Sequence, residues 1–400
     1  MIAREAYVKW LIKHKNNGLI KVVSGVRRSG KSTLFELYKN HIKSLDVDSA
    51  QIIHINFEDL AFYDLRSFLA LNEYIISLVD NTKKYYIFLD EIQAVDGFEK
   101  MLGSLNLREN LDIYVTGSNA FFMSGELATL LTGRYIELRI MPLSFKEFFS
   151  VHPEKALEDV YNLYCKSSFP YLAEKTDVEE RTFYIRSTYN DIAIKDIISR
   201  YKITEVGVLE RVLQFLLSTI GSEVSINKIA NSMKSQGVTI SNNTLEKYID
   251  ALVNGLIIYP APRYDVHGRR LLQRLEKYYV VDLGFKGLLL PSAVGDSGRE
   301  LENIVYLELK RRYREVYVGK CDKYEVDFVC LNDECEPAYY QVAFSTADDA
   351  TLSRELRSLE AIRDNNPKYL LTLDTINKTA NYNGIIKLNA LDWMLSKNNG

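Results

Sequence analysis

The sequence predicts an α/β fold: a parallel sheet first, followed by smaller helical and mixed modules. Three apolar runs support this prediction, at residues 20–24, 84–89 and 112–116. Continuous runs of this kind are typical of strands that are buried on both faces, as in parallel sheets. Each run ends in glycine, acidic or polar residues, and open α/β sheets bind their ligands at the carboxyl ends of the strands.

The first apolar run leads into a glycine-bounded loop with the spacing G-x-x-x-x-G-K-[ST] of a phosphate-binding loop. Its residues are Gly25, Val26, Arg27, Arg28, Ser29, Gly30, Lys31, Ser32 and Thr33. The two glycines let successive backbone N–H groups turn toward phosphate oxygens, and the helix that follows favours an anion at its N-terminus. In such a loop Lys31 reaches the β- and γ-phosphates and the Ser32 hydroxyl ligates Mg²⁺. These residues are the predicted site for ATP.

The strand at 84–89 brings two carboxylates, Asp90 and Glu91, to its carboxyl end. Beside a phosphate loop, Asp90 is predicted to hold Mg²⁺. Glu91 is predicted to polarise the attacking water as a general base. The alternative is that the two acids only cap a following helix.

The strand at 112–116 runs into Gly117-Ser118-Asn119. Asn119 is the predicted hydrogen-bond partner of the γ-phosphate or of the attacking water, with Ser118 as the next candidate. The alternative for this segment is an ordinary turn, because Gly, Ser and Asn favour turns.

Two further strands are predicted at 51–57 and 135–140, and His54 in the first is expected to be a packed strand residue. A helix is expected to begin after Ser144, because Glu147 stands three residues on and completes a capping box.

Five motifs in this order resemble a large family of prokaryotic AAA-type ATPases. They are Gly25-Val-Arg-Arg-Ser-Gly-Lys-Ser, Leu89-Asp-Glu-Ile-Gln, Thr116-Gly-Ser-Asn, Leu131-Thr-Gly-Arg and Pro142-Leu-Ser-Phe. The resemblance implies an ATP-hydrolysing, Mg²⁺-dependent domain over residues 1–150. It also implies that Arg134 meets the nucleotide phosphates, in the same chain or from a neighbouring subunit of a homo-oligomer. A structural salt bridge is the alternative role for Arg134.

Residues 151–204 are predicted to form a small helical lid. The family often has two glycines before its Phe-Pro pair, whereas Ser167 and Ser168 stand here. Within this lid the pairs Asp191/Lys195 and Asp196/Arg200 are four residues apart, and we interpret them as ordinary pairs along one helix surface.

Residues 205–275 predict three helices and a hairpin, the pattern of a winged helix-turn-helix. The third helix, at 241–252, would read DNA, and arginines of the hairpin would contact phosphates. The candidate contacts are Asn242, Asn243, Thr244 and Lys247 on the helix and Arg263, Arg269, Arg270 and Arg274 on the hairpin. The alternative is a spacer between proteins, because Glu246 and Asp250 offset the single lysine of the helix.

Residues 276–400 resemble the restriction-endonuclease-like domain that accompanies this ATPase family. Nucleases of this fold use an Asp, then Glu-x-Lys on the next strand, to hold Mg²⁺ and activate water. Asp327 fits the first position, but Gln341-Val342-Ala343 stands in place of Glu-x-Lys. Glu302 is either a further acid or a surface residue. The domain is therefore predicted to be catalytically degenerate.

The net charge, the cysteines and the apolar runs of the chain limit the partners and the cellular compartment that we expect. The net charge of −3 provides no general attraction to nucleic acid or to an acidic membrane. The four cysteines have no zinc spacing and suit a reducing cytosol, and no apolar run is long enough to span a membrane. We therefore expect a cytoplasmic ATPase whose partner is a protein client or DNA. The alternatives are a nucleotide-controlled DNA-binding switch and an ATP-gated nuclease.

Overall fold

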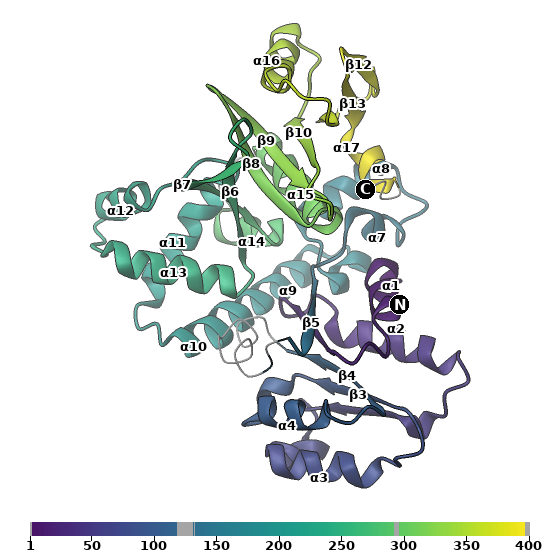
Figure 1. Ribbon diagram of the computed structural model, residues 1–400. Coiled ribbons are helices and arrows are strands. Elements are labelled where there is room, and N and C mark those ends of the chain that lie inside the picture. Colours follow the sequence, from purple (N-terminus) through teal and green to yellow (C-terminus); the bar gives the residue numbers. More distant parts are fainter. Residues whose placement is uncertain (1, 118–130, 132, 292–295, 397–400) are drawn as a thin grey trace.

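The N-terminal part of the chain forms a five-stranded, all-parallel sheet with the order β2-β3-β4-β1-β5. The structure is a computed structural model and describes residues 2–117, 131, 133–291 and 296–396 (Figure 1). The predicted parallel sheet is confirmed, and each strand starts and ends within one residue of its expected place. The strands are β1 (Ile20–Gly25), β2 (Ile52–Asn56), β3 (Tyr85–Asp90), β4 (Leu111–Thr116) and β5 (Tyr135–Ile140).

Helices cover both faces of this sheet. Alternate strand residues point to opposite faces, so Val22 packs toward α3 and α4 whereas Val23 packs toward α1 and α2. The strands of the centre are thus buried on both sides, which explains their uninterrupted apolar runs. The helices are α1 (Glu5–Lys13), α2 (Lys31–Lys43), α3 (Phe68–Leu78) and α4 (Phe98–Leu105), with 3₁₀ turns η1 (Ser49–Gln51), η2 (Leu60–Leu65) and η3 (Ile92–Ala94).

A helical segment leads away from β5. The predicted capping box is present, since the Ser144 side chain accepts from the Glu147 N–H and the Glu147 side chain accepts from the Ser144 N–H. Farther on, the helix that begins at Val178 changes to a wider π-helical path at Asp191 and back at Ser199. The elements are α7 (Phe145–Phe149), α8 (Leu157–Lys166), η4 (Pro170–Glu174), α9 (Val178–Asn190), η5 (Asp191–Ile198) and α10 (Ser199–Tyr201).

Three helices and an antiparallel hairpin follow. The Ser225 and Ser241 side chains cap the second and third helices by accepting from the backbone N–H groups of Lys228 and Thr244. The elements are α11 (Val206–Ser218), α12 (Ile226–Ser235), α13 (Asn242–Asn254), β6 (Ile258–Asp265) and β7 (Arg270–Val280).

The hairpin belongs to a second sheet of eight strands, with the order β12-β13-β11-β10-β9-β8-β6-β7. Its β6 pairs in parallel with β8, and the predicted boundary between residues 275 and 276 falls inside β7. The remaining strands are β8 (Glu315–Cys321), β9 (Tyr324–Leu331), β10 (Pro337–Ala343), β11 (Lys368–Thr372), β12 (Ala380–Tyr382) and β13 (Ile385–Asn389). The helices are α14 (Leu283–Leu289), α15 (Ser297–Arg312), α16 (Asp349–Glu360) and α17 (Ala390–Leu395).

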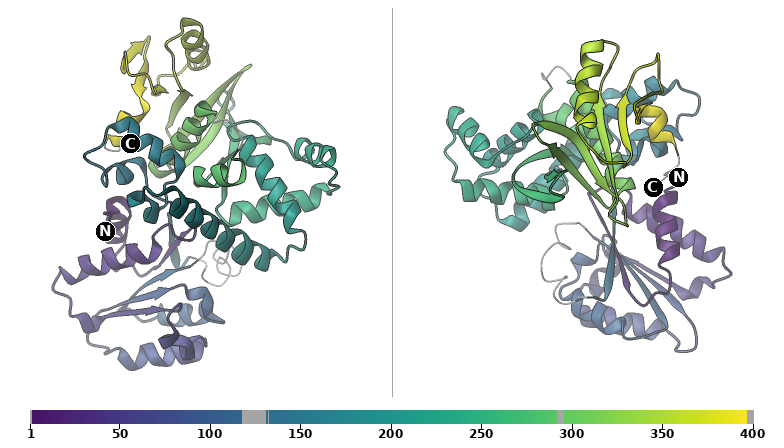
Figure 2. Two further views of the ribbon diagram at one scale, coloured as in Figure 1. Left: turned by 180° about the vertical axis from the view of Figure 1, so that it is seen from behind. Right: turned by 45° about the horizontal axis from the view of Figure 1, so that its top comes forward.

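The two sheets lie at opposite ends of the molecule, with α9 between them (Figures 1 and 2). One continuous hydrophobic core runs from Met141 through α8, α9, α11, α13 and α15 to Met394. The predicted boundary between residues 204 and 205 also lies within this core, so the C-terminal modules are packed together. Among the described residues, no helix has the length and apolar character that crossing a membrane requires.

Candidate functional site

The glycine-bounded loop joins the end of β1 to the start of α2, at the carboxyl edge of the first sheet. A side chain at Gly25 would place its Cβ 2.5 Å from the Ile140 carbonyl oxygen, so only glycine fits against β5. Gly30 has a φ of +97°, in the left-handed region that glycine adopts without strain. The close approach of β5 explains the glycine at position 25, and the left-handed backbone conformation explains the glycine at position 30.

Arg4, which the sequence analysis did not single out, supports the loop from behind. Its guanidinium is 4% exposed and donates to the carbonyl oxygens of Ser29 at 3.0 Å and Met141 at 2.7 Å. It also pairs with Glu147 at 3.0 Å. A single arginine ahead of an amphipathic helix has no motif around it, so only the fold reveals this role.

Lys31 begins α2 and turns back over the loop. Its buried ammonium donates to the Gly25 carbonyl oxygen at 3.3 Å and lies 3.7 Å from Glu91 Oε1. Ser32 and Thr33 follow with their side chains exposed at the first turn of the helix. The structure thus brings together Lys31, at the start of the helix that follows β1, and Glu91, just past the end of β3.

Asp90 ends β3 with a fully buried carboxylate. Its Oδ1 accepts from the Thr116 hydroxyl, and the same hydroxyl oxygen accepts from the Glu91 N–H at 3.0 Å. Asp90 Oδ2 is also buried but has no hydrogen-bond partner among the described residues. A buried carboxylate oxygen requires a donor or a cation. The Asp90 carboxylate therefore fits the predicted role of a Mg²⁺ ligand, and the Ser32 side chain is exposed at the first turn of α2.

Glu91 sits in the left-handed region of backbone conformation, with a φ of +56°. Such a conformation is uncommon for a residue other than glycine, and it clusters at functional sites. It turns the chain out of β3, and the Gln93 side-chain amide donates to the Glu91 carboxylate.

The two loop arginines reach across to the lid. Arg27 Nε donates to Asp196 at 2.7 Å, and Arg28 Nη2 donates to Asp191 at 2.7 Å. Burial raises the pKa of Asp196, and the hydrogen bond from Arg27 opposes that shift. The interpretation of these acids as members of ordinary pairs within their own helix missed this link, because both acids contact residues more than 160 positions away.

Arg134 lies at the other edge of the sheet, just before β5. Its side chain is exposed, and its carbonyl oxygen accepts from the N–H of Ile20 at the start of β1. Five residue steps of extended strand, about 17 Å, separate this point from Gly25. The structure does not bring Arg134 to the loop of its own chain. Asn119 and Ser118 lie outside the described residues.

Comparison with known proteins agrees with this geometry. Residues 17–149 match the profile of an AAA domain, and residues 157–293 match a domain of unknown function, DUF8612. An uncharacterized protein of Haemophilus influenzae is 37% identical over 403 residues, which cover 99% of each chain. This chain belongs to the same protein family. Uncharacterized protein MJ1544 of Methanocaldococcus jannaschii is 31% identical, over 96% of this chain and 85% of that one.

Among solved structures, the Walker-type ATPase paby2304 of Pyrococcus abyssi is 14% identical. Its TM-score is 0.48, over 72% of this chain and 96% of that one. The five-stranded parallel sheet and its glycine-bounded loop lie within residues 17–149, the part of the chain that matches the AAA domain profile.

This member of the family carries a second cluster of acids in its C-terminal sheet. The ammonium of Lys277, on β7, lies 3.0 Å from Glu302, 2.8 Å from Glu325 and 3.8 Å from Asp327. Burial alone would lower the pKa of Lys277, but the three carboxylates outweigh burial and raise it. Burial and the Glu302 carboxylate raise the pKa of Asp327. No sequence motif connects Lys277 with these acids.

Gln341, on the neighbouring strand β10, is held on both sides of its amide. Its Oε1 accepts from the Asp327 N–H at 3.2 Å and from the Ser358 hydroxyl at 3.1 Å, and its Nε2 donates to Glu355 at 2.8 Å. Glu302 is not a surface acid, because it pairs with Lys277 and accepts from the Tyr279 hydroxyl at 2.7 Å.

Proposed function

We propose that this protein binds ATP with Mg²⁺, hydrolyses it to ADP and phosphate, and couples the turnover to its C-terminal modules. The observation that carries the proposal is a buried Asp90 oxygen that has no partner among the described residues. Asp90 precedes Glu91, which contacts Lys31, at the carboxyl edge of the sheet. The AAA domain match over residues 17–149 supports the same activity.

Each residue of the site has a distinct role in this proposal. Lys31 exchanges its contacts with Gly25 and Glu91 for phosphate oxygens, which frees the Glu91 carboxylate to accept a proton from the attacking water. Asp90 and Ser32 hold Mg²⁺, which supplies charge neutralisation at the phosphates. Loop N–H groups from Val26 to Thr33 bind phosphate oxygens, and Asn119 hydrogen-bonds the γ-phosphate or the water.

The test separates binding from chemistry. Lys31→Ala should lose ATP binding, whereas Glu91→Gln should keep binding and lose hydrolysis by roughly 10²-fold or more. Glu109→Gln, an exposed acid ahead of β4, is the matched control and should hydrolyse ATP like the wild type. Equal phosphate release by Glu91→Gln and Glu109→Gln would refute the assignment.

Arg134 is proposed to act on the nucleotide of a neighbouring subunit in a homo-oligomer. Its exposed side chain and its distance of a strand length from its own loop favour contact across a boundary over contact within the chain. An arginine supplied in this way stabilises the charge that develops on the transferred phosphoryl group.

The coupling is proposed to run through the loop arginines. Phosphate oxygens compete with Asp196 and Asp191 for Arg27 and Arg28, because both kinds of anion form charge-assisted hydrogen bonds with guanidinium groups. The segment that carries the two acids, η5, packs directly on α13. A Cβ at Gly255, just past α13, would lie 2.5 Å from Ile197 Cδ1.

The three helices with their hairpin are proposed to be a winged helix-turn-helix, with α13 as the candidate DNA reader. Asn242, Asn243 and Lys247 are exposed. Arg263 is not available to DNA, because its side chain is 14% exposed and pairs with Glu223 at 2.9 Å. Arg269 and Arg270 remain exposed on the hairpin, whereas the Arg274 side chain lies outside the described residues. A nucleotide-controlled DNA-binding switch is therefore the second candidate function.

Salt dependence tests this second candidate. Contacts between arginine and phosphate release counterions, so affinity for duplex DNA should fall steeply as salt rises. The variant Arg269→Ala/Arg270→Ala should bind more weakly, with a shallower slope. Unchanged affinity in that variant, or none in the wild type, would leave the module as a spacer between proteins.

The C-terminal domain is proposed to keep a restriction-endonuclease-like fold without cutting DNA. Its core runs α15, β8, β9, β10, α16, β11, and Asp327 and Gln341 stand on adjacent strands. The Lys277 ammonium occupies the centre of the acids, Gln341 is neutral, and Ala343 offers no amine. Hard divalent ions favour carboxylate oxygens that are free to coordinate them.

The alternative to a C-terminal domain that does not cut DNA is an ATP-gated nuclease. The full chain, with and without ATP, would be incubated with Mg²⁺ or Mn²⁺ and single-stranded, duplex or branched DNA. We expect no cleavage. Cleavage that Asp327→Ala abolishes would make the gated nuclease the preferred function.

A further inference from the structure

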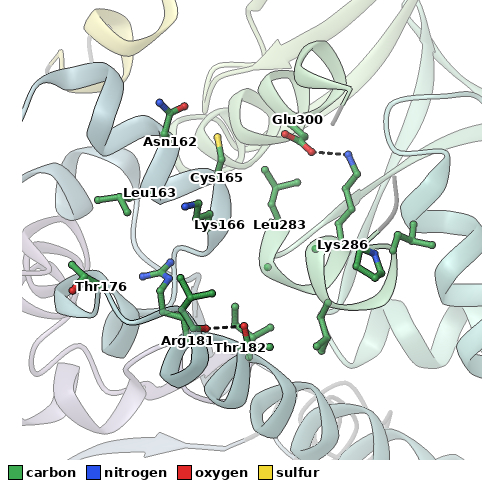
Figure 3. Close-up of a pocket in the computed structure, with 17 residues that line it drawn as sticks. Asn162, Leu163, Cys165, Lys166, Thr176, Arg181, Thr182, Leu283, Lys286 and Glu300 are labelled. Carbon is green, nitrogen blue, oxygen red and sulfur yellow. Dashed lines mark hydrogen bonds and ion pairs between the residues drawn. The ribbon is translucent and has the colours of Figure 1, made fainter. Parts of the chain in front are cut away.

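A cavity of about 790 Å³ lies between the lid and the C-terminal part of the chain (Figure 3). It is formed by α8, by α9 and the residues ahead of it, by α14, and by Glu300 of α15. Its volume is within the range of cavities that hold small organic molecules. Apolar side chains make up much of the wall: Leu163, Val178, Ile185, Leu283, Leu288 and Leu290.

The buried cation of this cavity is Arg181, which is 6% exposed. Its Nη1 donates to the carbonyl oxygens of Leu172 at 2.7 Å and Lys175 at 2.8 Å. Its Nη2 is buried and has no hydrogen-bond partner in the part of the chain that the structure describes. Leaving a buried charged donor unsatisfied is costly, so this nitrogen requires an acceptor from outside the fold.

The nearby acids do not supply that acceptor. Asp282 attracts Arg181 through space, but its carboxylate already accepts from the Ser168 N–H and hydroxyl and from the Gly284 N–H. Glu300 is the one acid among the described residues that line the cavity, and it pairs with Lys286 at 2.8 Å.

A second cation faces the same space. The side chains of Lys166, from α8, and Arg181, from α9, lie on one side of the cavity, whereas the Lys286–Glu300 pair lies on the other (Figure 3). Three cations and one acid leave the lining with a charge of +2. An anion bound in the cavity would be attracted by both Lys166 and Arg181.

We propose that this cavity binds a small organic anion. Its carboxylate or phosphate group accepts from Arg181 Nη2 and from the Lys166 ammonium, and its apolar body lies on Leu163, Ile185 and Leu283. Charge-assisted bonds of this kind orient the head group, and the apolar wall contributes the remaining affinity. The site is separate from the phosphate loop and does not depend on the proposed ATPase activity.

The experiment is calorimetric titration of the full chain carrying Lys31→Ala, so that the phosphate loop does not compete for anions. The probes are octanoate, octyl phosphate, inorganic phosphate and 1-octanol. We expect one equivalent of octanoate or octyl phosphate to bind, and the stronger of the two identifies the head group. Inorganic phosphate and 1-octanol, which each lack one half of the ligand, should bind at least about tenfold more weakly.

Arg181→Gln should weaken binding of the better probe by roughly tenfold or more, the effect of losing a charged hydrogen bond. Arg186→Gln is the matched control, because Arg186 is exposed on the same helix and does not line the cavity. Since Arg181 also holds two loop carbonyls, Arg181→Gln could fail to fold. In that case the affinity of Lys166→Gln for the better probe tests the proposal, because Lys166 is exposed and its replacement should not affect folding. No binding by either amphipathic probe, or wild-type affinity in Lys166→Gln and in a folded Arg181→Gln, would overturn the proposal.

Discussion

Two clusters in this protein place a lysine among carboxylates, and they differ in what is left unpaired. At the phosphate loop, Lys31 makes only long contacts, at 3.3 and 3.7 Å, and one oxygen of Asp90 has no partner among the described residues. In the C-terminal sheet, Lys277 lies at 2.8 and 3.0 Å from two acids, and every buried polar atom of the described cluster is paired. The same residue types thus form a site prepared for a ligand in one place and a closed ionic network in the other.

The largest expected effect tests whether Arg134 of a neighbouring subunit completes the cluster at the phosphate loop. Arg134→Ala should lower ATP hydrolysis by roughly 10³-fold, the scale for an arginine that stabilises the transition state. Mixing Arg134→Ala with Glu91→Gln protein should restore partial activity, because some interfaces then contain both groups. Phosphate release by the mixture is the measurement. The absence of rescue in a demonstrably assembled mixture would indicate a structural role.

Disrupting the cluster around Lys277 should lower the free energy of unfolding of the protein. Lys277→Ala removes the cation from Glu302 and Asp327, which are largely buried, and from the exposed Glu325, and breaking a buried pair costs about 3–5 kcal/mol of unfolding free energy. Lys31→Ala should change stability far less, because its contacts are long. Urea unfolding of both variants measures the difference. Lys323→Ala, at an exposed position near the same sheet, is the control and should unfold like the wild type. Equal loss in Lys31→Ala and Lys277→Ala would contradict the distinction between the clusters.

A smaller effect is expected for the link between the loop and the lid. Asp196→Asn keeps the size of the side chain but weakens its bond to Arg27, so affinity for ATP should rise by a few fold as the arginine becomes available to phosphate. Asp191→Asn should act in the same direction through Arg28. Titration of a fluorescent ATP analogue measures this change. Weaker binding in both variants would show that the acids position the arginines and do not compete for them.

The smallest expected effect is on the pH dependence of stability. Two acids of the C-terminal module, Asp327 and Asp374, should change the stability in opposite directions as pH rises. The raised pKa of Asp327 means that the folded protein keeps a proton that the unfolded chain loses near pH 4. Stability from this group is full below about pH 4 and declines as pH rises through the folded value. Burial tends to raise the pKa of Asp374, but bonds from Lys387, Ser345 and Thr346 lower it overall. Stability from Asp374 is present above about pH 4 and declines as pH falls.

The measurement is the urea midpoint of wild type, Asp327→Asn and Asp374→Asn at a series of pH values below and above about pH 4. Relative to the wild type, Asp327→Asn should gain stability as pH rises, whereas Asp374→Asn should lose it. Parallel pH profiles would contradict the assigned shifts.

The sequence predicted one sheet far better than the other, for a physical reason. Parallel strands buried on both faces must be apolar throughout, so β3 and β4 could be found from composition alone. The glycines of the loop and the acids at the end of β3 have fixed spacing, which located most of the candidate site. The parallel pairing of β6 with β8 leaves no such pattern, because either strand reads as part of a separate hairpin.

Contacts between distant residues were the other part that the sequence could not supply. Arg4 beneath the loop, Thr116 between the two acids of β3, and Lys277 among the C-terminal carboxylates each act through partners on another element. The π-helical turn in η5, which carries Asp196 toward Arg27, has no periodic signature of its own.

The pairing of β6 with β8 has a mechanical consequence. Residues 263–265 of the hairpin pair with residues 318–320 of the last module, so we expect the hairpin, the α13 helix packed on it and the eight-stranded sheet to move together. In the coupling proposed above, a displacement that began at Arg27 and passed through η5 would therefore reach the α13 surface and the far end of the C-terminal sheet in the same step. Partners bound at these two surfaces would be repositioned together, with a fixed geometry between them.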